Sequence, residues 1–108
     1  MVAAPELPPL VERTVQRLIR AFAPEQILLF GSQAKRHAGE RSDFDLLVVT
    51  ELDGWPGARD RRARQLATDC FPPVDVVFAT PEEIAGAAEA KSPFLLSILG
   101  SGIVLYRR

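Results

Sequence analysis

Residues 27–50 read ILLFGSQAKRHAGERSDFDLLVVT, and this stretch decides the fold that the sequence predicts. It begins with an apolar run, turns at Gly31 and Ser32, passes through a polar segment that we expect to form a short helix and loop, and ends in a second apolar run. Glycine permits a sharp turn and a close backbone approach to a ligand, and Ser32 can cap the following helix, whose free N–H groups then face an anion. The stretch therefore predicts two strands joined through a phosphate-binding turn.

Two aspartates, Asp43 and Asp45, stand at the start of the second apolar run. Successive side chains of a strand point to opposite faces, so these carboxylates share one face and Phe44 points to the other. Like charges on one face repel each other, whereas a hard divalent cation between them reverses that cost. The pair predicts a magnesium site, although an Asp-x-Asp pair taken alone is more often part of a solvated turn.

A third carboxylate, Asp75, lies among the apolar and aromatic residues of the stretch 73–78. An unpaired buried carboxylate is costly, so we expect this side chain to be buried against a partner or a metal ion. A structural salt bridge to one of the arginines is the alternative interpretation.

The rest of the chain divides into short helices and strands at proline and glycine. The helical spacing of Val11, Val15, Leu18 and Phe22 predicts a first helix that ends at Pro24. The other predicted elements are strands at residues 25–30, 46–49, 73–78 and 103–106 and helices at 58–70, from Pro81 and from Pro93. This order predicts an α+β fold in which helices pack on a small mixed sheet.

Composition limits the classes of protein to which the chain can belong. With 108 residues, 47% hydrophobic residues and a formal charge of −1, we expect a single domain over residues 1–108. The near-neutral charge gives no reason to expect direct nucleic-acid or membrane binding. The single cysteine, Cys70, forms no internal disulfide and belongs to no zinc-ligand cluster, which suits a reducing cytoplasm.

The segment 59–64 is a basic stretch with four arginines and one aspartate. A solvated helix face is the ordinary interpretation of such a stretch. Contact with an acidic partner or with nucleotide phosphates is the alternative.

These motifs together resemble the signature of the nucleotidyltransferase superfamily, in particular its minimal nucleotidyltransferase (MNT) domains. The resemblance rests on the Gly31-Ser32 turn, on Ser42-Asp43-Phe44-Asp45-Leu46 about a dozen residues later, and on Asp75 in a later apolar run. It extends to the C-terminal segments 92–95 and 101–106, and so covers nearly the whole chain. The sequence departs from the family pattern at Gln33 and Lys35, where arginine is frequent, and at Arg36, where glycine is usual.

The resemblance implies a catalytic site. Asp43, Asp45 and Asp75 would bind Mg²⁺, and Asp75 would also help to activate an acceptor hydroxyl as a base. The nucleotide phosphates would be held by Gly31, Ser32 and Lys35. The reaction implied is transfer of a nucleoside monophosphate, AMP from ATP being the expected case, to an acceptor hydroxyl.

The resemblance also implies a partner protein. MNT domains of this size resemble the antitoxins of two-gene systems whose toxin is a HEPN ribonuclease, which active members adenylylate. The alternative from another functional class is a binding module that neutralises such a toxin by contact alone, with idle carboxylates. The intact aspartates favour the enzyme, whereas Gln33 and Arg36 leave room for the binding module.

Overall fold

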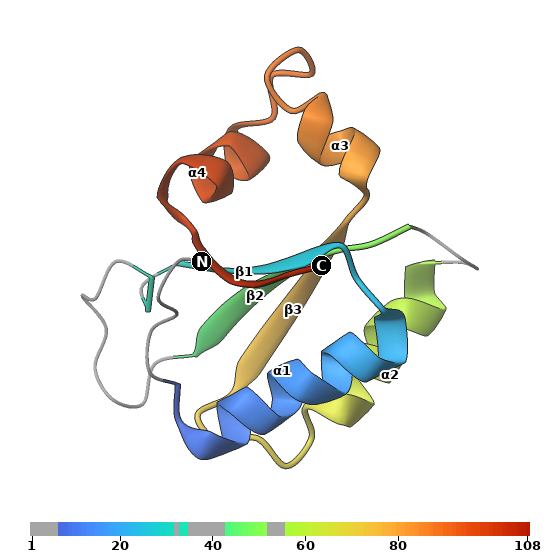
Figure 1. The fold of residues 1–108 in the computed structure, drawn as a ribbon, viewed down its shortest axis with the longest axis vertical. Helices are drawn as coiled ribbons and strands as arrows, with labels where there is room; N and C mark the ends of the chain where they lie inside the picture. The colour runs from blue at the N-terminus through green and yellow to red at the C-terminus, as the bar shows by residue number, and fades with distance from the viewer. Residues whose placement is uncertain (1–6, 32, 35–42, 52–55) are drawn as a thin grey trace.

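The computed structural model describes residues 7–31, 33–34, 43–51 and 56–108 (Figure 1). Four helices and four strands follow one another in the described part of the chain. They are α1 (Pro9–Phe22), β1 (Gln26–Phe30), β2 (Phe44–Val49), α2 (Pro56–Leu66), β3 (Val74–Ala79), α3 (Pro81–Ala85), α4 (Pro93–Ser101) and β4 (Ile103–Arg107).

The four strands form one mixed sheet in the order β3-β2-β1-β4. Strand β1 is antiparallel to both β2 and β4, whereas β2 and β3 run parallel. The register between β1 and β4 shifts between Ile27 and Leu28, which marks a bulge or irregularity in that pair. The predicted α+β fold with a mixed sheet is confirmed.

Each face of the sheet is covered by a different pair of helices. Helices α1 and α2 lie on one face, and α3 and α4 lie on the other (Figure 1). Alternation along β2 divides its side chains between the two layers, with Phe44, Leu46 and Val48 packed toward α1 and α2. Leu47 and Val49 pack on the opposite side with Ile98 of α4. Because β2 is buried on both faces, its apolar sequence is almost continuous.

Helix α1 ends where the sequence predicts. Ala23 adopts a left-handed backbone conformation (φ 44°) and its N–H donates to the carbonyl of Ile19. The buried ring of Pro24 follows and cannot continue the helix. This sharp end lets the chain reverse directly into β1.

Helix α2 is shorter than the predicted helix over residues 58–70. Beyond Leu66, the N–H of Thr68 donates to the carbonyl of Gln65 and that of Cys70 to the carbonyl of Ala67. These three-residue steps form tight turns in place of α-helix. No helix in the described part of the chain is long and apolar enough to cross a membrane.

A candidate active site at one end of the central strands

The carboxylates predicted to act together are brought together by the pairing of β2 and β3. Asp45 and Asp75 are register partners in this parallel pair. Register partners on neighbouring strands point to the same face of a sheet, which here is the face covered by α3 and α4. Asp43 stands two residues before Asp45, immediately ahead of β2. The pairing therefore brings Asp75 from a distant part of the sequence to the end of the sheet where Asp43 and Asp45 stand.

The electrostatics of Asp45 reflect this crowding. Burial of its carboxyl group raises the pKa of Asp45 above the ordinary value, and the negative charges of Asp75 and Asp43 raise it further. Both effects oppose the ionised form of the group. A cation bound beside Asp45 would act in the opposite direction and favour its carboxylate.

The prediction that Asp75 is buried is wrong. Its side chain is exposed, as is that of Asp43, whereas Asp45 is half-buried. The reason is the sheet order, which places β3 at an edge, so apolar neighbours in the sequence do not enclose Asp75 from every side. An exposed carboxylate needs no ion pair for stability, and its side chain can rotate toward a ligand.

The donor chemistry of this cluster fits Mg²⁺, which prefers carboxylate oxygens. Among the described residues, however, no group of three or more His, Cys, Asp or Glu side chains stands in an arrangement that could hold a metal ion. Rotation of the exposed side chains of Asp43 and Asp75 would be needed to bring three carboxylates onto one ion. The backbone thus places the three aspartates at one end of the sheet, whereas their side chains do not yet point to one metal position.

Gly31 is required by the same cluster. Its backbone has φ +77°, a conformation that side-chain-bearing residues rarely adopt, and a Cβ added there would overlap the Oδ2 atom of Asp45. The turn after β1 therefore passes directly against the central carboxylate. Of the other residues predicted to hold phosphates, Ser32 and Lys35 lie outside the described residues.

An aromatic pair that the sequence analysis did not predict borders the cluster. Phe30 is the antiparallel register partner of Asp45, on the side of β2 away from Asp75. Its ring packs edge to face against Phe94 of α4 with centroids 5.6 Å apart. Phe94 remains 49% exposed. The only sequence signal for it is its place in the first turn of a helix that begins at Pro93, which does not reveal the contact with Phe30.

A groove of about 470 Å³ leads away from the cluster along β3. Its walls are β3 on one side and α2 on the other. The lining residues are Arg59, Asp60, Ala63, Arg64 and Val74 to Phe78, which include Asp75.

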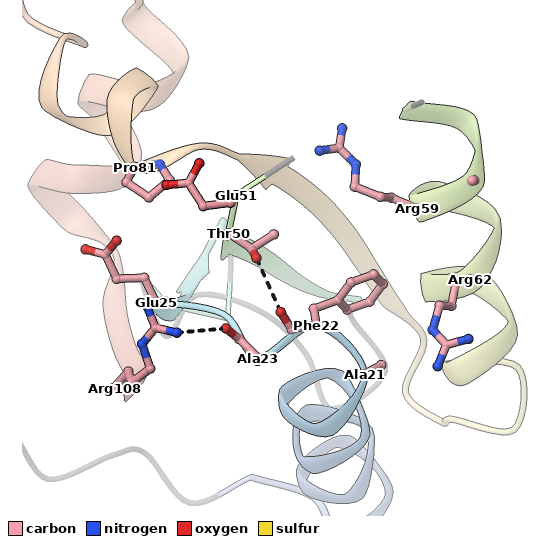
Figure 2. Close-up of a pocket in the computed structure, with 11 residues that line it drawn as sticks. Ala21, Phe22, Ala23, Glu25, Thr50, Glu51, Arg59, Arg62, Pro81 and Arg108 are labelled. Atoms are coloured by element: carbon pink, nitrogen blue, oxygen red, sulfur yellow. Dashed lines mark hydrogen bonds between the residues drawn. The ribbon is translucent and has the colours of Figure 1, made fainter. Parts of the chain in front are cut away.

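A second cavity of about 450 Å³ lies near the opposite end of β2 (Figure 2). Thr50 and Glu51, which follow β2, face it together with Phe22, Arg59 and Arg108. Hydrogen bonds from Thr50 to the carbonyl of Phe22 (3.4 Å) and from Arg108 to that of Ala23 (3.3 Å) tie its walls to the end of α1. None of the three clustered aspartates lines this cavity.

The raised pKa of Asp45 predicts how the D45N substitution changes stability with pH. A carboxyl group whose pKa is higher in the folded than in the unfolded state stabilises the fold at low pH, and this contribution is lost as the pH rises through the folded-state value. D45N removes the free-energy cost of keeping this carboxylate ionised in the folded state. The variant should therefore unfold at higher urea concentration than the wild type at pH 7, and the difference should shrink below about pH 4.

The control for this measurement is D69N, which changes an exposed aspartate in the turn after α2. The urea concentration at which D69N unfolds should stay close to that of the wild type at every pH. A D45N domain that is less stable than the wild type at pH 7 would contradict the repulsive character of the cluster.

The chain is similar to known proteins in sequence and in fold. Residues 12–108 match the family model described as Polymerase beta, Nucleotidyltransferase. No curated protein matches the chain. Among solved structures, one described as the toxin–antitoxin with AMP-PNP aligns with a TM-score of 0.61 and 24% identity, over 90% of this chain and 73% of the other.

Two further structures share this fold. A putative nucleotidyltransferase from Sulfolobus solfataricus aligns with a TM-score of 0.56 and 18% identity, over 92% of this chain and 78% of that one. The toxin–antitoxin MntA-HpeT, in a form carrying two aspartate-to-glutamate changes, aligns with a TM-score of 0.58 and 23% identity, over 90% and 73% of the two chains. The resemblance seen in the sequence is thus confirmed over nearly all of its length, and the chain belongs to the Polymerase beta nucleotidyltransferase family.

Proposed function

We propose that this domain transfers AMP from ATP to a hydroxyl group of a partner protein, and that it serves as the antitoxin of a HEPN/MNT toxin–antitoxin pair. The observation that supports this most directly is the register of β2 and β3, which sets Asp45 beside Asp75 and within electrostatic reach of Asp43. Family membership supports nucleotidyl transfer as the general reaction.

The proposed roles follow from where each residue stands. Asp43, Asp45 and Asp75 would hold Mg²⁺, which when bound offsets phosphate charge. Gly31 lets the turn after β1 pass close to Asp45, so phosphates held by this turn would lie beside the metal-binding carboxylates. Ser32 and Lys35 would contribute a cap and a positive charge to the same phosphates. The exposed ring of Phe94 offers a flat apolar surface beside the cluster.

The chemical step forms one bond and breaks another. The oxygen of the acceptor hydroxyl attacks the α-phosphorus of ATP, the bond from that phosphorus to the bridging oxygen breaks, and pyrophosphate leaves with the electron pair. The hydroxyl proton passes to the carboxylate of Asp75 and from there to water. Because Asp75 is exposed at the sheet edge, an acceptor on another protein can approach it.

The partner is proposed from the structural neighbours. Two of them are toxin–antitoxin proteins, one of them solved with AMP-PNP, and this domain covers most of each. The likeness in fold supports the same kind of assembly for this chain. We further propose that the toxin belongs to the HEPN class and that the nucleotide is ATP.

A domain that neutralises its toxin by contact alone is the second candidate. One observation favours it: among the described residues, the acidic side chains do not converge on a single metal position. Gln33 and Arg36 also depart from the pattern expected for a phosphate-binding loop. Binding and transfer experiments separate the two candidates.

The proposal predicts that ATP with Mg²⁺ stabilises the folded domain. A ligand that binds only the folded state, present at one hundred times its Kd, adds about 2.7 kcal/mol to the free energy of unfolding. Differential scanning fluorimetry should show a rise in Tm that disappears with EDTA. D43N and D45N should abolish the rise, whereas the control D69N should keep it. Equal rises in all four proteins would place the nucleotide elsewhere.

A second prediction concerns the acceptor. With ATP labelled at the α-phosphate, wild-type protein should transfer the label to its co-purified partner, and D75N should lower the rate by about 10²- to 10⁴-fold, as expected for loss of a general base. Binding of the partner, measured by calorimetry, should stay within about twofold of the wild type, since an exposed side chain is changed without loss of volume. If the wild type binds the partner and transfers no label, the contact antitoxin is the correct function.

A further inference from the structure

The outer edge of β3 carries backbone hydrogen-bonding groups that no other described residue uses. Two hydrogen bonds at the ends of the parallel pair show which backbone groups of β3 face β2. The N–H of Phe44 donates to the carbonyl of Pro73, and the N–H of Thr50 donates to the carbonyl of Ala79, both at 2.9 Å. Since backbone groups alternate in direction along a strand, the odd-numbered residues from Pro73 to Ala79 face β2. Val74, Val76 and Phe78 therefore direct their N–H and C=O groups outward.

This edge is accessible over most of its length. β3 ends the sheet order, and no described residue forms a hydrogen bond to the outward groups of Val74, Val76 or Phe78. The groove of about 470 Å³ runs beside the five residues from Val74 to Phe78. Natural proteins usually cover or disrupt an open strand edge, because it is a template for pairing with another chain. An edge that remains open beside a candidate active site is therefore a candidate docking surface.

The helix wall of the groove is positively charged. Two arginines, Arg59 and Arg64, line this wall, and Asp60 is the one acidic residue among its described lining residues. The guanidinium of Arg59 lies 5.1 Å from the centre of the Phe78 ring. Its Nε and Nη1 atoms are buried and have no hydrogen-bond partner among the described residues. Buried donors without an acceptor are unfavourable, so the Arg59 guanidinium would gain by turning outward to a carboxylate on an added strand, whose two oxygens match its fork.

From these features we propose that the β3 edge binds an extended segment of the acceptor protein as an additional strand. The inference rests on the proposed function and names the form of its substrate. A residue level with Asp75 on the added strand would point to the same face as Asp75, so the hydroxyl to be modified belongs at that position. Its neighbours at odd spacings would point to the face covered by α2, where Arg59 and Arg64 select acidic side chains.

The matched variants for the test are V76P and V76A. Proline removes one outward N–H without touching the groups that face β2, and alanine removes a comparable side chain while keeping the N–H. The probe is an acetylated nine-residue peptide with a tyrosine at its centre. Glutamates stand one and three positions before and after the tyrosine, and the remaining positions are valine or threonine. A twin peptide carries lysine in place of glutamate.

Fluorescence polarisation of the labelled peptides should show about tenfold or greater preference for the glutamate peptide in the wild type, since main-chain pairing supplies affinity and the arginines supply selection. V76A should bind within about threefold of the wild type, and V76P about tenfold more weakly, the expected effect of one lost hydrogen bond. The double variant R59E/R64E should prefer the lysine peptide. Equal binding by V76P and V76A, or an unchanged preference in the double variant, would overturn the inference.

Amide hydrogen exchange provides a second measurement that does not depend on how well V76P folds. In the free wild-type protein the N–H groups of Val74, Val76 and Phe78 should exchange faster than those of Asp75 and Val77, and the glutamate peptide should slow the first three selectively. Absence of that protection at saturating peptide would also overturn the inference.

Label transfer separates this inference from the function on which it rests. If the peptide protects the β3 edge and no AMP reaches its tyrosine or the natural partner, docking stands and the transferase fails. If AMP reaches the partner equally fast with V76P and V76A, the transferase stands and docking at the edge fails.

Discussion

The structure depends most on the parallel pairing of β2 with β3. These strands are separated in the sequence by α2 and its connections, yet their register joins six consecutive residue pairs from Phe44 with Val74 to Val49 with Ala79. A shift of one residue would turn Asp75 to the face covered by α1 and α2 and separate it from Asp45. Both helix layers pack against this pair, with Val48 buried in one layer and Val49 in the other, and the fit of that packing holds the register. The apolar core thus fixes the positions of the charges.

Gly31 shows how closely the site and the fold constrain each other. The turn that ends β1 must reverse direction beside Asp45, and the space between backbone and carboxylate admits no Cβ. Asp45 in turn lies on a buried strand although burial and its acidic neighbours raise its pKa. Both residues are locally unfavourable for an unliganded domain, a pattern typical of sites kept for binding or chemistry.

The sequence predicted the elements and their order because its signals are local. Proline and glycine marked the ends of α1, α3 and α4, and the apolar run after the Asp-x-Asp pair predicted that both aspartates lie at the start of β2. The exposure of Asp75 could not be predicted from its apolar neighbours in the sequence. Exposure depends on whether a strand is central or at an edge, and strand order is a property of the whole sheet. The pairing of Phe30 with Phe94 was missed for the same reason, since it joins two segments that no sequence period connects.

The irregular pairing of β1 with β4 has a consequence for how the domain opens. This pair joins Gln26 to Arg107, which are 81 residues apart, whereas β1 and β2 are neighbours in sequence. Long-range contacts form late in folding, and a register shift weakens the ladder that holds them. We therefore expect β4 to detach as a local unit at lower free energy than the rest of the sheet. Such an opening would leave β1, β2 and β3 paired, so the end of the sheet that carries the aspartates is insulated from fluctuations at the other edge.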